Sequence, residues 1–260
     1  MKISIVTATF NSGGTVRDTL ESVLGQTFCD YEHLIIDGGS SDDTLGIVRE
    51  YEPRYNGRLR WISERDRGIY DAMNKGIAMA TGDVVGILNS DDFYTSTNVL
   101  AQVAEAMQDA TVDAVYGDVH YVNDGDLSKC TRYYSSAGFR RWKMRLGWMP
   151  AHPSFYCRRL VYERYGAFDL SFKIGADFEN LLRLIYVHRI NTRYLPLDFV
   201  TMRQGGASTS GLKSHRQILN DHLRAYRKNN VNSNIFLESL RYAAKLGEIA
   251  SFRTKSALGL

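Results

Sequence analysis

The chain has no uncharged apolar run near the roughly 20 residues that a membrane-spanning helix requires. Its first residues lead directly into an apolar segment and lack the charged, apolar and cleavage regions of a signal peptide, so we expect a cytoplasmic protein. Cysteine is scarce: Cys29, Cys130 and Cys157 have spacings that suit neither a disulfide framework nor a cysteine-ligated metal. The motifs G-x-G-x-x-G and G-x-S-x-G are missing, which argues against a dinucleotide site and a serine nucleophile.

A short apolar segment followed by a polar loop and a helical pattern recurs in the first third of the chain. Residues 3–8, 33–36, 59–63 and 83–88 predict strands, and apolar residues at helical spacing lie between them, as in residues 15–25. This alternation is typical of a mostly parallel, Rossmann-like α/β sheet with helices on both faces. With 44% apolar residues among 260, the chain can bury the core of one large or two small domains.

Two adjacent carboxylates, Asp91 and Asp92, end the fourth apolar segment. A buried strand does not accommodate such a pair, so we expect it just beyond the strand's carboxyl end, where open parallel sheets bind their ligands. Two oxygen ligands at that place suit Mn²⁺ or Mg²⁺. The alternative is a helix cap, in which Ser90 or Asp91 caps the next helix and Asp92 favours its positive end.

Polar residues also follow the second and third predicted strands. Asp37 has glycines directly after it and can reach a ribose hydroxyl or the polar edge of a base. Asp66, Arg67 and Lys75 lie in an unusually polar segment where a helix must begin, and they could address a phosphate or a sugar. A solvated, salt-bridged turn is the alternative for this segment.

Five motifs of this part of the chain occur in a fixed order and together resemble glycosyltransferase family two. Their sequences are Thr-Ala-Thr-Phe-Asn, Ser-Val-Leu-Gly-Gln-Thr-Phe, Ile-Ile-Asp-Gly-Gly-Ser-Ser-Asp-Asp-Thr, Asp-Arg-Gly-Ile-Tyr-Asp-Ala-Met-Asn-Lys-Gly and Leu-Asn-Ser-Asp-Asp. The resemblance is close over residues 2–94 and looser to about residue 208. It implies the A-type glycosyltransferase fold and an inverting transfer of sugar from a nucleotide-sugar donor, UDP-linked donors included, with the help of a divalent metal.

The resemblance also implies roles for individual residues. Asp91 or Asp92 would ligate Mn²⁺ or Mg²⁺. The family's usual pattern is Asp-x-Asp, and Asn89 occupies its first acid position here, so the identity of the ligand stays open between the two acids. The residues that the resemblance assigns to the nucleotide are Thr7, Thr9, Asn11, Asp37, Asp66, Lys75, Asn89 and Ser90.

The candidate general base is Asp177, at the start of a predicted helix. Related enzymes place an acid that faces the acceptor at the head of this helix, and capping of the helix is the alternative. Glu179, two positions on, has a different helical azimuth and stays a candidate donor or acceptor contact. Two further candidates of that kind are Asp118, after a predicted strand over residues 112–116, and His152 in a His-Pro element. A turn residue and a structural histidine are the respective alternatives.

Two other segments have recognisable composition. Residues 129–149 are rich in arginine, lysine and aromatics, which could hold a sugar by stacking and a lipid phosphate by charge, or could form amphipathic helices on the sheet. Residues 203–208 predict a flexible loop that could close over the donor and exclude water. We do not expect a nucleic-acid partner, because the body of the chain is not strongly basic.

The charge of the chain is concentrated at its C-terminal end. Residues 213–260 contain nine lysines and arginines against three acids, a net +6, which leaves −3 for residues 1–212 of a chain whose total is +3. We therefore divide the chain into a catalytic domain over 1–212, with a nucleotide-binding half (1–95) and an acceptor half (96–212), and a helical extension over 213–260. Its two helices, expected near 213–229 and 233–256, could attach to an anionic membrane, or pack on the body or on a second subunit.

The expected function is sugar transfer to a hydroxyl of a glycan or a polyprenyl-diphosphate-linked acceptor in cell-surface polysaccharide biosynthesis, at the inner face of the cell membrane. Hexosyl and N-acetylhexosaminyl donors both fit this expectation. Two rivals stay open: a nucleotidyltransferase, which would need a basic glycine-rich loop that residues 7–17 hardly provide, and a non-catalytic module that binds nucleotide sugars.

Overall fold

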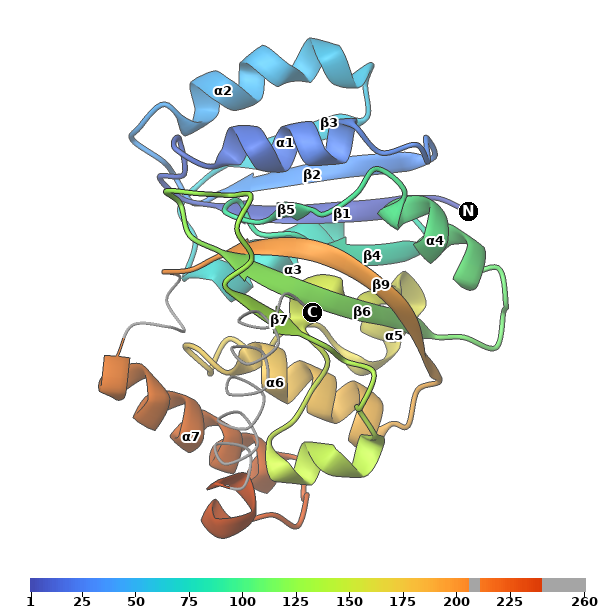
Figure 1. Cartoon of the computed structure of the whole chain (residues 1–260), viewed down its shortest axis with the longest axis vertical. Helices are drawn as coiled ribbons and strands as arrows, with labels where there is room; N and C mark the ends of the chain where they lie inside the picture. The colour runs from blue at the N-terminus through green and yellow to red at the C-terminus, as the bar shows by residue number, and fades with distance from the viewer. Residues whose placement is uncertain (206–210, 240–260) are drawn as a thin grey trace.

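The computed structural model of the chain describes residues 1–205 and 211–239, without the side chains of 211–215. Its centre is a nine-stranded sheet in the order β3-β2-β1-β4-β8-β6-β9-β5, with β7 paired to β6 (Figure 1). The strands are β1 (Ile3–Thr9), β2 (Tyr31–Asp37), β3 (Leu59–Ser63), β4 (Val84–Ile87), β5 (Phe93–Tyr94), β6 (Ala114–Val122), β7 (Arg132–Tyr134), β8 (Tyr156–Arg158) and β9 (Thr192–Arg203).

The four predicted strands pair in parallel, because β1 pairs in parallel with both β2 and β4, and β2 pairs in parallel with β3; a further parallel pair is β6 and β9. Strands β1, β2 and β4 are buried along their whole length, which is why apolar segments predict them, whereas the edge strand β3 is exposed at Arg60 and Ser63. The helices are α1 (Val16–Leu24), α2 (Thr44–Tyr51), α3 (Ile69–Met79), α4 (Val99–Ala106), α5 (Arg159–Tyr165), α6 (Ala176–Leu181) and α7 (Gly211–Lys228). The predicted α/β architecture is therefore confirmed.

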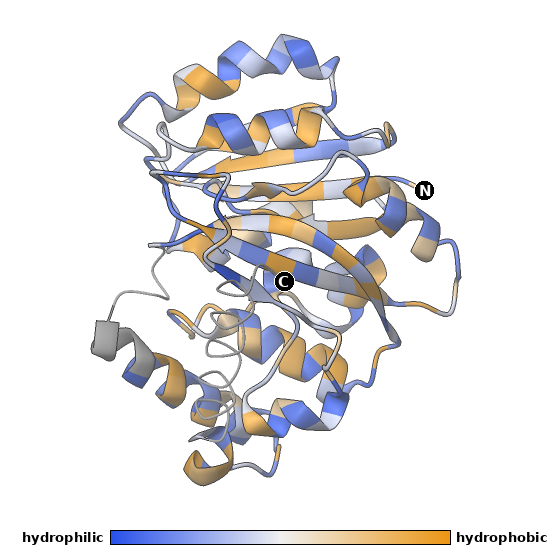
Figure 2. Cartoon of the chain, viewed as in Figure 1, coloured by the Kyte–Doolittle hydropathy of each residue, from blue (hydrophilic) through white to orange (hydrophobic). Residues whose placement is uncertain are grey.

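Two apolar clusters fill the space on the two faces of the sheet. Ile3 and Ile5 of β1 point into the cluster that contains α1, α2 and α4, whereas Val6 and Ala8 point into the cluster that contains α3, α5 and α6. Apolar residues accordingly run along the strands in Figure 2, and hydrophilic residues colour the outer sides of the helices. The alternation along β1 thus decides which face each of its side chains meets.

The second half of the sheet corrects one boundary. We expected the strand after α4 to end at Gly117 and Asp118, but β6 continues to Val122, with a register irregularity against β9 at this point. A Cβ atom on Gly117 would lie 2.4 Å from the Phe199 ring, so only glycine fits against β9 here. The glycine therefore marks a close approach of two strands within the sheet, and Asp118 lies inside β6.

The beginning of the C-terminal extension packs on the rest of the chain. In Figure 1, α7 lies beside α6, and the His222 ring of α7 stacks on Phe178 of α6 with a centroid distance of 3.6 Å. Most of the second predicted C-terminal helix, from residue 240, and residues 206–210 of the predicted closing loop lie outside the described residues. No helix in the described part of the chain has the length and apolar character needed to cross a membrane.

Candidate active site

The carboxyl ends of β1, β2 and β4 meet at one edge of the sheet. Asn11, in the left-handed region at φ 50°, donates its backbone N–H to the Ser40 hydroxyl at 2.7 Å. Its side-chain oxygen accepts the N–H of Ser41 at 2.9 Å. The hydroxyls of Ser12 and Ser90 are 2.8 Å apart and join this loop to the end of β4. The structure therefore brings the three predicted strand ends together, opposite the N-terminus in Figure 1.

Asp37 lies at this edge, but its carboxylate oxygens already accept hydrogen bonds from protein donors. The side chain is fully buried and accepts the backbone N–H groups of Gly39 and Ser40, both at 3.0 Å. The hydroxyls of Ser40 and Ser63 donate to it at 2.5 and 2.6 Å. Asp37 thus shapes the loop after β2, and a ribose or a base could bond to it only by displacing one of these donors.

Thr7, which the resemblance assigns to the nucleotide, is engaged inside the protein. Thr7 is fully buried on the inner face of β1, and its hydroxyl lies 2.9 Å from Nε2 of His33. Nδ1 of His33 lies 3.0 Å from the hydroxyl of Tyr55, which itself donates to the carbonyl of Leu20 at 2.6 Å. The Tyr55 hydroxyl has one proton and donates it to the Leu20 carbonyl. Nδ1 of His33 is therefore the donor to Tyr55, and Nε2 accepts from Thr7.

Thr9, two residues further along β1, is also almost completely buried. Its hydroxyl has no hydrogen-bond partner among the described residues. Of the two threonines, Thr9 therefore keeps a free polar group at the end of the strand.

The buried His33 makes folding stability depend on pH. Burial lowers the pKa of this imidazole to about 3, so the folded protein keeps it neutral while the unfolded chain takes up a proton below about pH 6.5. Stability contributed by neutral His33 is complete above that pH and is lost as the pH falls towards 3. Between pH 7 and pH 5 we expect the free energy of unfolding of the wild type to fall by about 2 kcal/mol because of His33. The variant His33→Gln should not show this decrease, and urea unfolding measures it in both proteins. Equal losses in both proteins would contradict this assignment.

The polar segment before α3 forms ion pairs at its surface. Lys75 Nζ lies 2.7 Å from the carboxylate of Glu64, and Arg67 lies 3.0 Å from that of Asp71. Asp66 accepts the backbone N–H of Gly68 at 2.8 Å. These contacts are the salt-bridged turn that we kept as the alternative. Such exposed pairs contribute little to stability, so Lys75 and Arg67 can exchange a carboxylate for a phosphate at low cost.

The acidic pair does not cap a helix, because β5 follows it directly and α4 begins only at Val99. Asp91 is partly buried, which raises the pKa of its carboxyl, and no other described residue donates a hydrogen bond to that group. Asp92 is only 2% exposed and accepts from the side-chain amide of Asn89 at 3.2 Å. Burial, and then the adjacent Asp91, hold the pKa of Asp92 well above its usual range. The two acids are therefore not equivalent.

Arg203, the first residue of the predicted closing loop, is instead the last residue of β9 and a member of this site through contacts that the sequence did not indicate. Its Nη1 donates to the carbonyl oxygen of Asp91 at 2.7 Å, and its side chain forms ion pairs with Asp18 and Asp124. It is 8% exposed, and its charge opposes the rise in the pKa of both Asp91 and Asp92. No local pattern connects an arginine at this position with acids more than a hundred residues earlier.

The structure also brings His152 and Asp177 to this side of the sheet. Both line a small cavity below Ile87, the last residue of β4. Burial lowers the pKa of His152, while Asp177 and Asp91 oppose that shift, so the imidazole lies within electrostatic reach of both acids. Asp177 lies in the first turn of α6, where Gly175 is the N-cap, and its Oδ1 accepts the backbone N–H of Phe178 at 2.8 Å. Its partly exposed carboxylate can face a ligand.

Two other candidate acids are bonded to protein groups in this structure. Asp118 is buried and accepts the hydroxyls of Tyr133 and Tyr194, both at 2.9 Å. Glu179 is 1% exposed and pairs with Arg183 at 3.0 Å. A substrate hydroxyl could bond to either carboxylate only if one of these protein donors were displaced.

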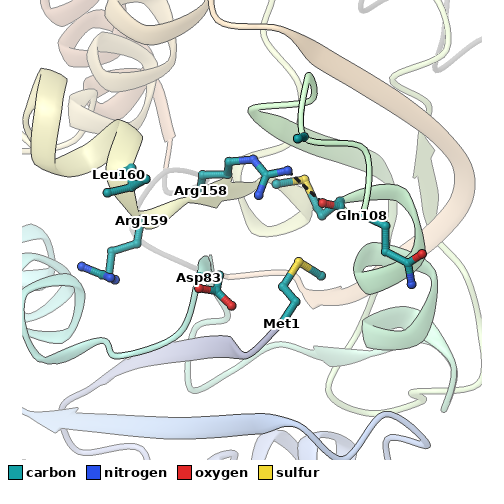
Figure 3. A pocket seen from close by; sticks show the side chains of 8 residues that line it. Met1, Asp83, Gln108, Arg158, Arg159 and Leu160 are labelled. Carbon is teal, nitrogen blue, oxygen red and sulfur yellow. Dashed lines mark hydrogen bonds between the residues drawn. The ribbon is translucent and has the colours of Figure 1, made fainter.

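A larger cavity, of about 360 Å³, lies at the opposite end of the sheet, next to Met1 and Asp83 (Figure 3). Its two arginines are engaged with the backbone, because Arg158 Nε donates to Val112 at 2.8 Å and Arg159 Nε donates to Gly82 at 3.0 Å. The cavity is therefore lined by structural arginines, and the reactive side chains lie elsewhere.

The acidic pair fits a metal that arrives with a diphosphate. In the described ranges no group of three or more histidine, cysteine or acidic side chains is arranged to hold a metal. Magnesium-type ions at phosphate sites need only one or two carboxylates, because phosphate and water supply the other ligands. Asn89 Oδ1 is buried without a hydrogen-bond partner in the described chain, which leaves an oxygen beside the pair for a ligand.

Comparisons with known proteins agree with this geometry. The family model for glycosyl transferase family 2 matches residues 4–166. A glycosyltransferase of Mycobacterium tuberculosis (strain CDC 1551) is 34% identical over 83% of this chain and 78% of its own length. A PGL/p-HBAD biosynthesis glycosyltransferase of Mycobacterium bovis (strain BCG / Pasteur 1173P2) is 29% identical over 80% of this chain and 79% of its own.

Solved structures with low sequence identity share the fold. S. aureus TarS in complex with UDP-GlcNAc superposes with a TM-score of 0.69 at 19% identity, over 90% of this chain and 68% of that one. This chain spans 43% of a longer TarS chain. A mannosyltransferase of Pyrobaculum calidifontis in complex with GDP-Man and Mn²⁺ has a TM-score of 0.65 at 18% identity, over 98% and 79% of the two chains. The A-type fold that the motifs implied is therefore confirmed.

Proposed function

The chain belongs to glycosyl transferase family 2, and from that premise we propose that it moves a sugar from a nucleotide diphosphate to an acceptor hydroxyl with inversion at the anomeric carbon. One observation carries the proposal: the loops after β1 and β2 meet the end of β4, where the pair Asp91–Asp92 follows, and the candidate base Asp177 lines a cavity together with Ile87 of that strand. A donor can therefore reach metal ligands and a base at the same time.

The proposed donor is UDP-linked, with a hexosyl or N-acetylhexosaminyl sugar, in analogy to the UDP-GlcNAc bound in TarS. Asn11, Asp66, Lys75, Asn89 and Ser90 would surround its nucleotide. Phe10, which we did not predict from the sequence, belongs to the same surface. Its ring is 62% exposed at the end of β1, and an ideal Cβ on Gly38 would lie 3.4 Å from it. An exposed aromatic face at this point suits a stacked base.

Phe10→Ala should weaken UDP binding about tenfold, because the stacking of a base on an aromatic side chain contributes about 1–3 kcal/mol. Isothermal titration of UDP in the presence of Mn²⁺ measures the change. Phe236→Ala is the matched control, since Phe236 is 71% exposed near the other end of the chain and should leave the affinity unchanged. Equal affinities for the two variants would remove Phe10 from the donor site.

The proposed metal is Mn²⁺ or Mg²⁺, held by Asp91 with oxygens of the donor. Asp91 is favoured over Asp92 because its carboxylate is the less buried and accepts no bond from another described residue. A bound divalent cation supplies positive charge that offsets the charge developing on the departing diphosphate. Arg203 and Asn89 would keep the pair in place from the protein side.

In the proposed mechanism Asp177 removes the proton of the acceptor hydroxyl as the hydroxyl oxygen bonds to the anomeric carbon. The bond between that carbon and the diphosphate oxygen breaks at the same time, and its electron pair leaves with the nucleoside diphosphate. One displacement inverts the configuration and requires no covalent enzyme intermediate. His152, near both Asp177 and Asp91, would contact the acceptor or the diphosphate between them.

The proposed acceptor is a glycan or a lipid-linked glycan of cell-surface polysaccharide biosynthesis, and the similarity to a mycobacterial glycosyltransferase of PGL/p-HBAD biosynthesis supports a role in a biosynthetic pathway of this kind. The basic extension over 213–260 begins with α7, which packs on the body, and its charge could in addition bring the catalytic part, residues 1–212, to the membrane that carries such a lipid or to a second subunit.

A panel of nucleotide sugars with Mn²⁺ tests the proposed function. The expected result is sugar transfer, or slow hydrolysis of the donor by water, with one or few of the nucleotide sugars. Release of pyrophosphate from a nucleoside triphosphate would instead indicate a nucleotidyltransferase, and binding without turnover would indicate a non-catalytic module. The same panel in EDTA tests the metal requirement.

A further inference from the structure

Helix α3 presents two of its polar side chains to the acceptor half of the protein. Tyr70 and Asn74 are four residues apart and share one face of the helix. The Asn74 amide donates to the carbonyl of Phe168 and accepts its N–H, both at 2.8 Å. The Tyr70 hydroxyl donates to the carbonyl of Ile174 and lies 3.4 Å from Oδ1 of Asp177. Both contacts therefore fall on the segment that leads to the candidate base.

The other polar side chains of α3 belong to the donor side. Asp71 and Lys75 form ion pairs with Arg67 and Glu64 in the polar turn before the helix. The helix is thus a rigid connection, 11 residues long, between the surface proposed for the nucleotide and the segment of residues 168–177. Since a helix moves as one body, it can transmit the position of one surface to the other.

The C-terminal extension holds the same segment from a second direction. Asp221 of α7 accepts the backbone N–H of Gly175, the N-cap of α6, at 3.2 Å. Gln217 donates to the same carboxylate at 2.9 Å. Up to Gly175 this segment is a loop, with exposed positions at Ser171 and Lys173, and its last two residues begin α6. Anchors at both ends of the loop replace the secondary structure that it lacks.

The hydroxyl of Tyr70 has no partner besides this segment among the described residues. The Tyr70 ring does not need this hydroxyl in order to pack, because the ring stacks on Phe168 with a centroid distance of 5.5 Å. Burial and the charge of Asp177 hold the pKa of this phenol well above its usual range, so the hydroxyl keeps its proton at any ordinary pH. It is therefore available as a donor to Ile174 or, after rotation, to Asp177.

We propose that Tyr70 and Asn74 are positioning residues, which hold the segment of residues 168–177 so that Asp177 meets the acceptor hydroxyl in line with the donor. The inference rests on the proposed function, since Asp177 is the base there. A displacement of about 1 Å can lower a rate about 100-fold, so a base at the head of a helix that follows a loop needs such anchors. The donor-side helix then also determines where the acceptor is deprotonated.

Tyr70→Phe tests the proposal, because it removes the hydroxyl and leaves the ring. We expect kcat to fall about tenfold or more, with the KM for the donor, the UDP affinity and the melting temperature nearly unchanged. In an Asp177→Asn background the same substitution should cost less than about twofold, because Tyr70 acts through Asp177. Tyr116→Phe is the matched control: Tyr116 is buried in the same apolar cluster but contacts Phe139 and Tyr194, so its kcat should equal that of the wild type.

A second variant covers the case in which Tyr70→Phe does not fold. Asn74→Asp loses the bond to the Phe168 carbonyl and keeps an acceptor for its N–H, and should again lower kcat with the UDP affinity retained. Backbone hydrogen exchange of residues 168–177 should quicken in this variant, while exchange in β1 and β2 stays the same. That measurement needs no substrate, so unchanged protection overturns the proposal whether or not transfer is seen.

The kinetic outcomes separate this proposal from the proposed function. The positioning role is overturned if Tyr70→Phe has the wild-type kcat. It is also overturned if this substitution lowers kcat by the same factor in the wild-type and the Asp177→Asn background. Neither result affects the proposal of sugar transfer. Full activity of Asp177→Asn overturns the base instead, and then the loss caused by Tyr70→Phe cannot act through it. Absence of any sugar transfer by the wild type overturns the proposed function, and the exchange measurement still decides the anchoring of the segment.

Discussion

Asp177→Asn should lower sugar transfer about 10³-fold while it leaves the affinity for the donor unchanged. The amide cannot take the proton of the acceptor hydroxyl, and the loss of a positioned general base typically costs about 10²–10⁴-fold in rate. The donor does not depend on this proton, so its binding should persist. Parallel measurements of initial rates at saturating donor and of UDP affinity by titration give both numbers.

Asp109→Asn is the matched control for this experiment. Asp109 pairs with Arg193 at the protein surface, outside the candidate site and the segment before α6, so its loss should change the rate less than about twofold. The two variants together separate the loss of a base from the general effect of replacing a carboxylate by an amide. Transfer by Asp177→Asn near the wild-type rate would show that another group accepts the proton, and His152 would become the first candidate.

The second large effect concerns the acidic pair, and the two acids should behave differently. Asp91→Asn should weaken UDP binding in Mn²⁺ by about 100-fold or more. Substitution of a residue that only supports a metal ligand already lowers metal affinity about 10–100-fold, and loss of the ligand itself should have a larger effect. Asp92→Asn should cost much less. Asp92 is 2% exposed, and an asparagine in its place keeps an oxygen that can accept from the Asn89 amide.

Titration of UDP into each variant, once with Mn²⁺ and once with EDTA, separates metal-dependent binding from the rest. In EDTA the two variants and the wild type should bind UDP equally. If Asp92→Asn shows the larger loss in Mn²⁺, Asp92 is the ligand and the burial argument fails. If neither substitution changes the dependence on Mn²⁺, the pair does not bind the metal.

Local patterns in the sequence were sufficient for the first half of the fold. A strand buried on both faces must be apolar along its length, and polar residues must follow where it reaches the edge of the sheet, so both its position and its end can be read directly. The order of strand, loop and helix then predicts parallel pairing. For these reasons the sheet of β1 to β4 and the convergence of Asn11, Asp37 and Asp91 were predictable.

The direction of individual side chains was not predictable in the same way. Thr7 and Thr9 look equivalent in the sequence, yet Thr7 bonds to His33 of the neighbouring strand and Thr9 is left without a partner. Which acids are already satisfied is likewise a tertiary property. Asp118 receives its donors from β7 and β9, and Glu179 from Arg183 and Asn229.

The sequence by itself determined the family, the α/β sheet and the edge of that sheet where ligands bind, because motif order and apolar periodicity are local properties of the chain. Only the tertiary structure decided that Arg203 lies against Asp91, that Asp92 is the buried acid, and that Tyr70 reaches the segment of Asp177. These pairs are separated by a hundred residues or more, or depend on burial. The folded chain brings together charges and hydroxyls that no local pattern relates.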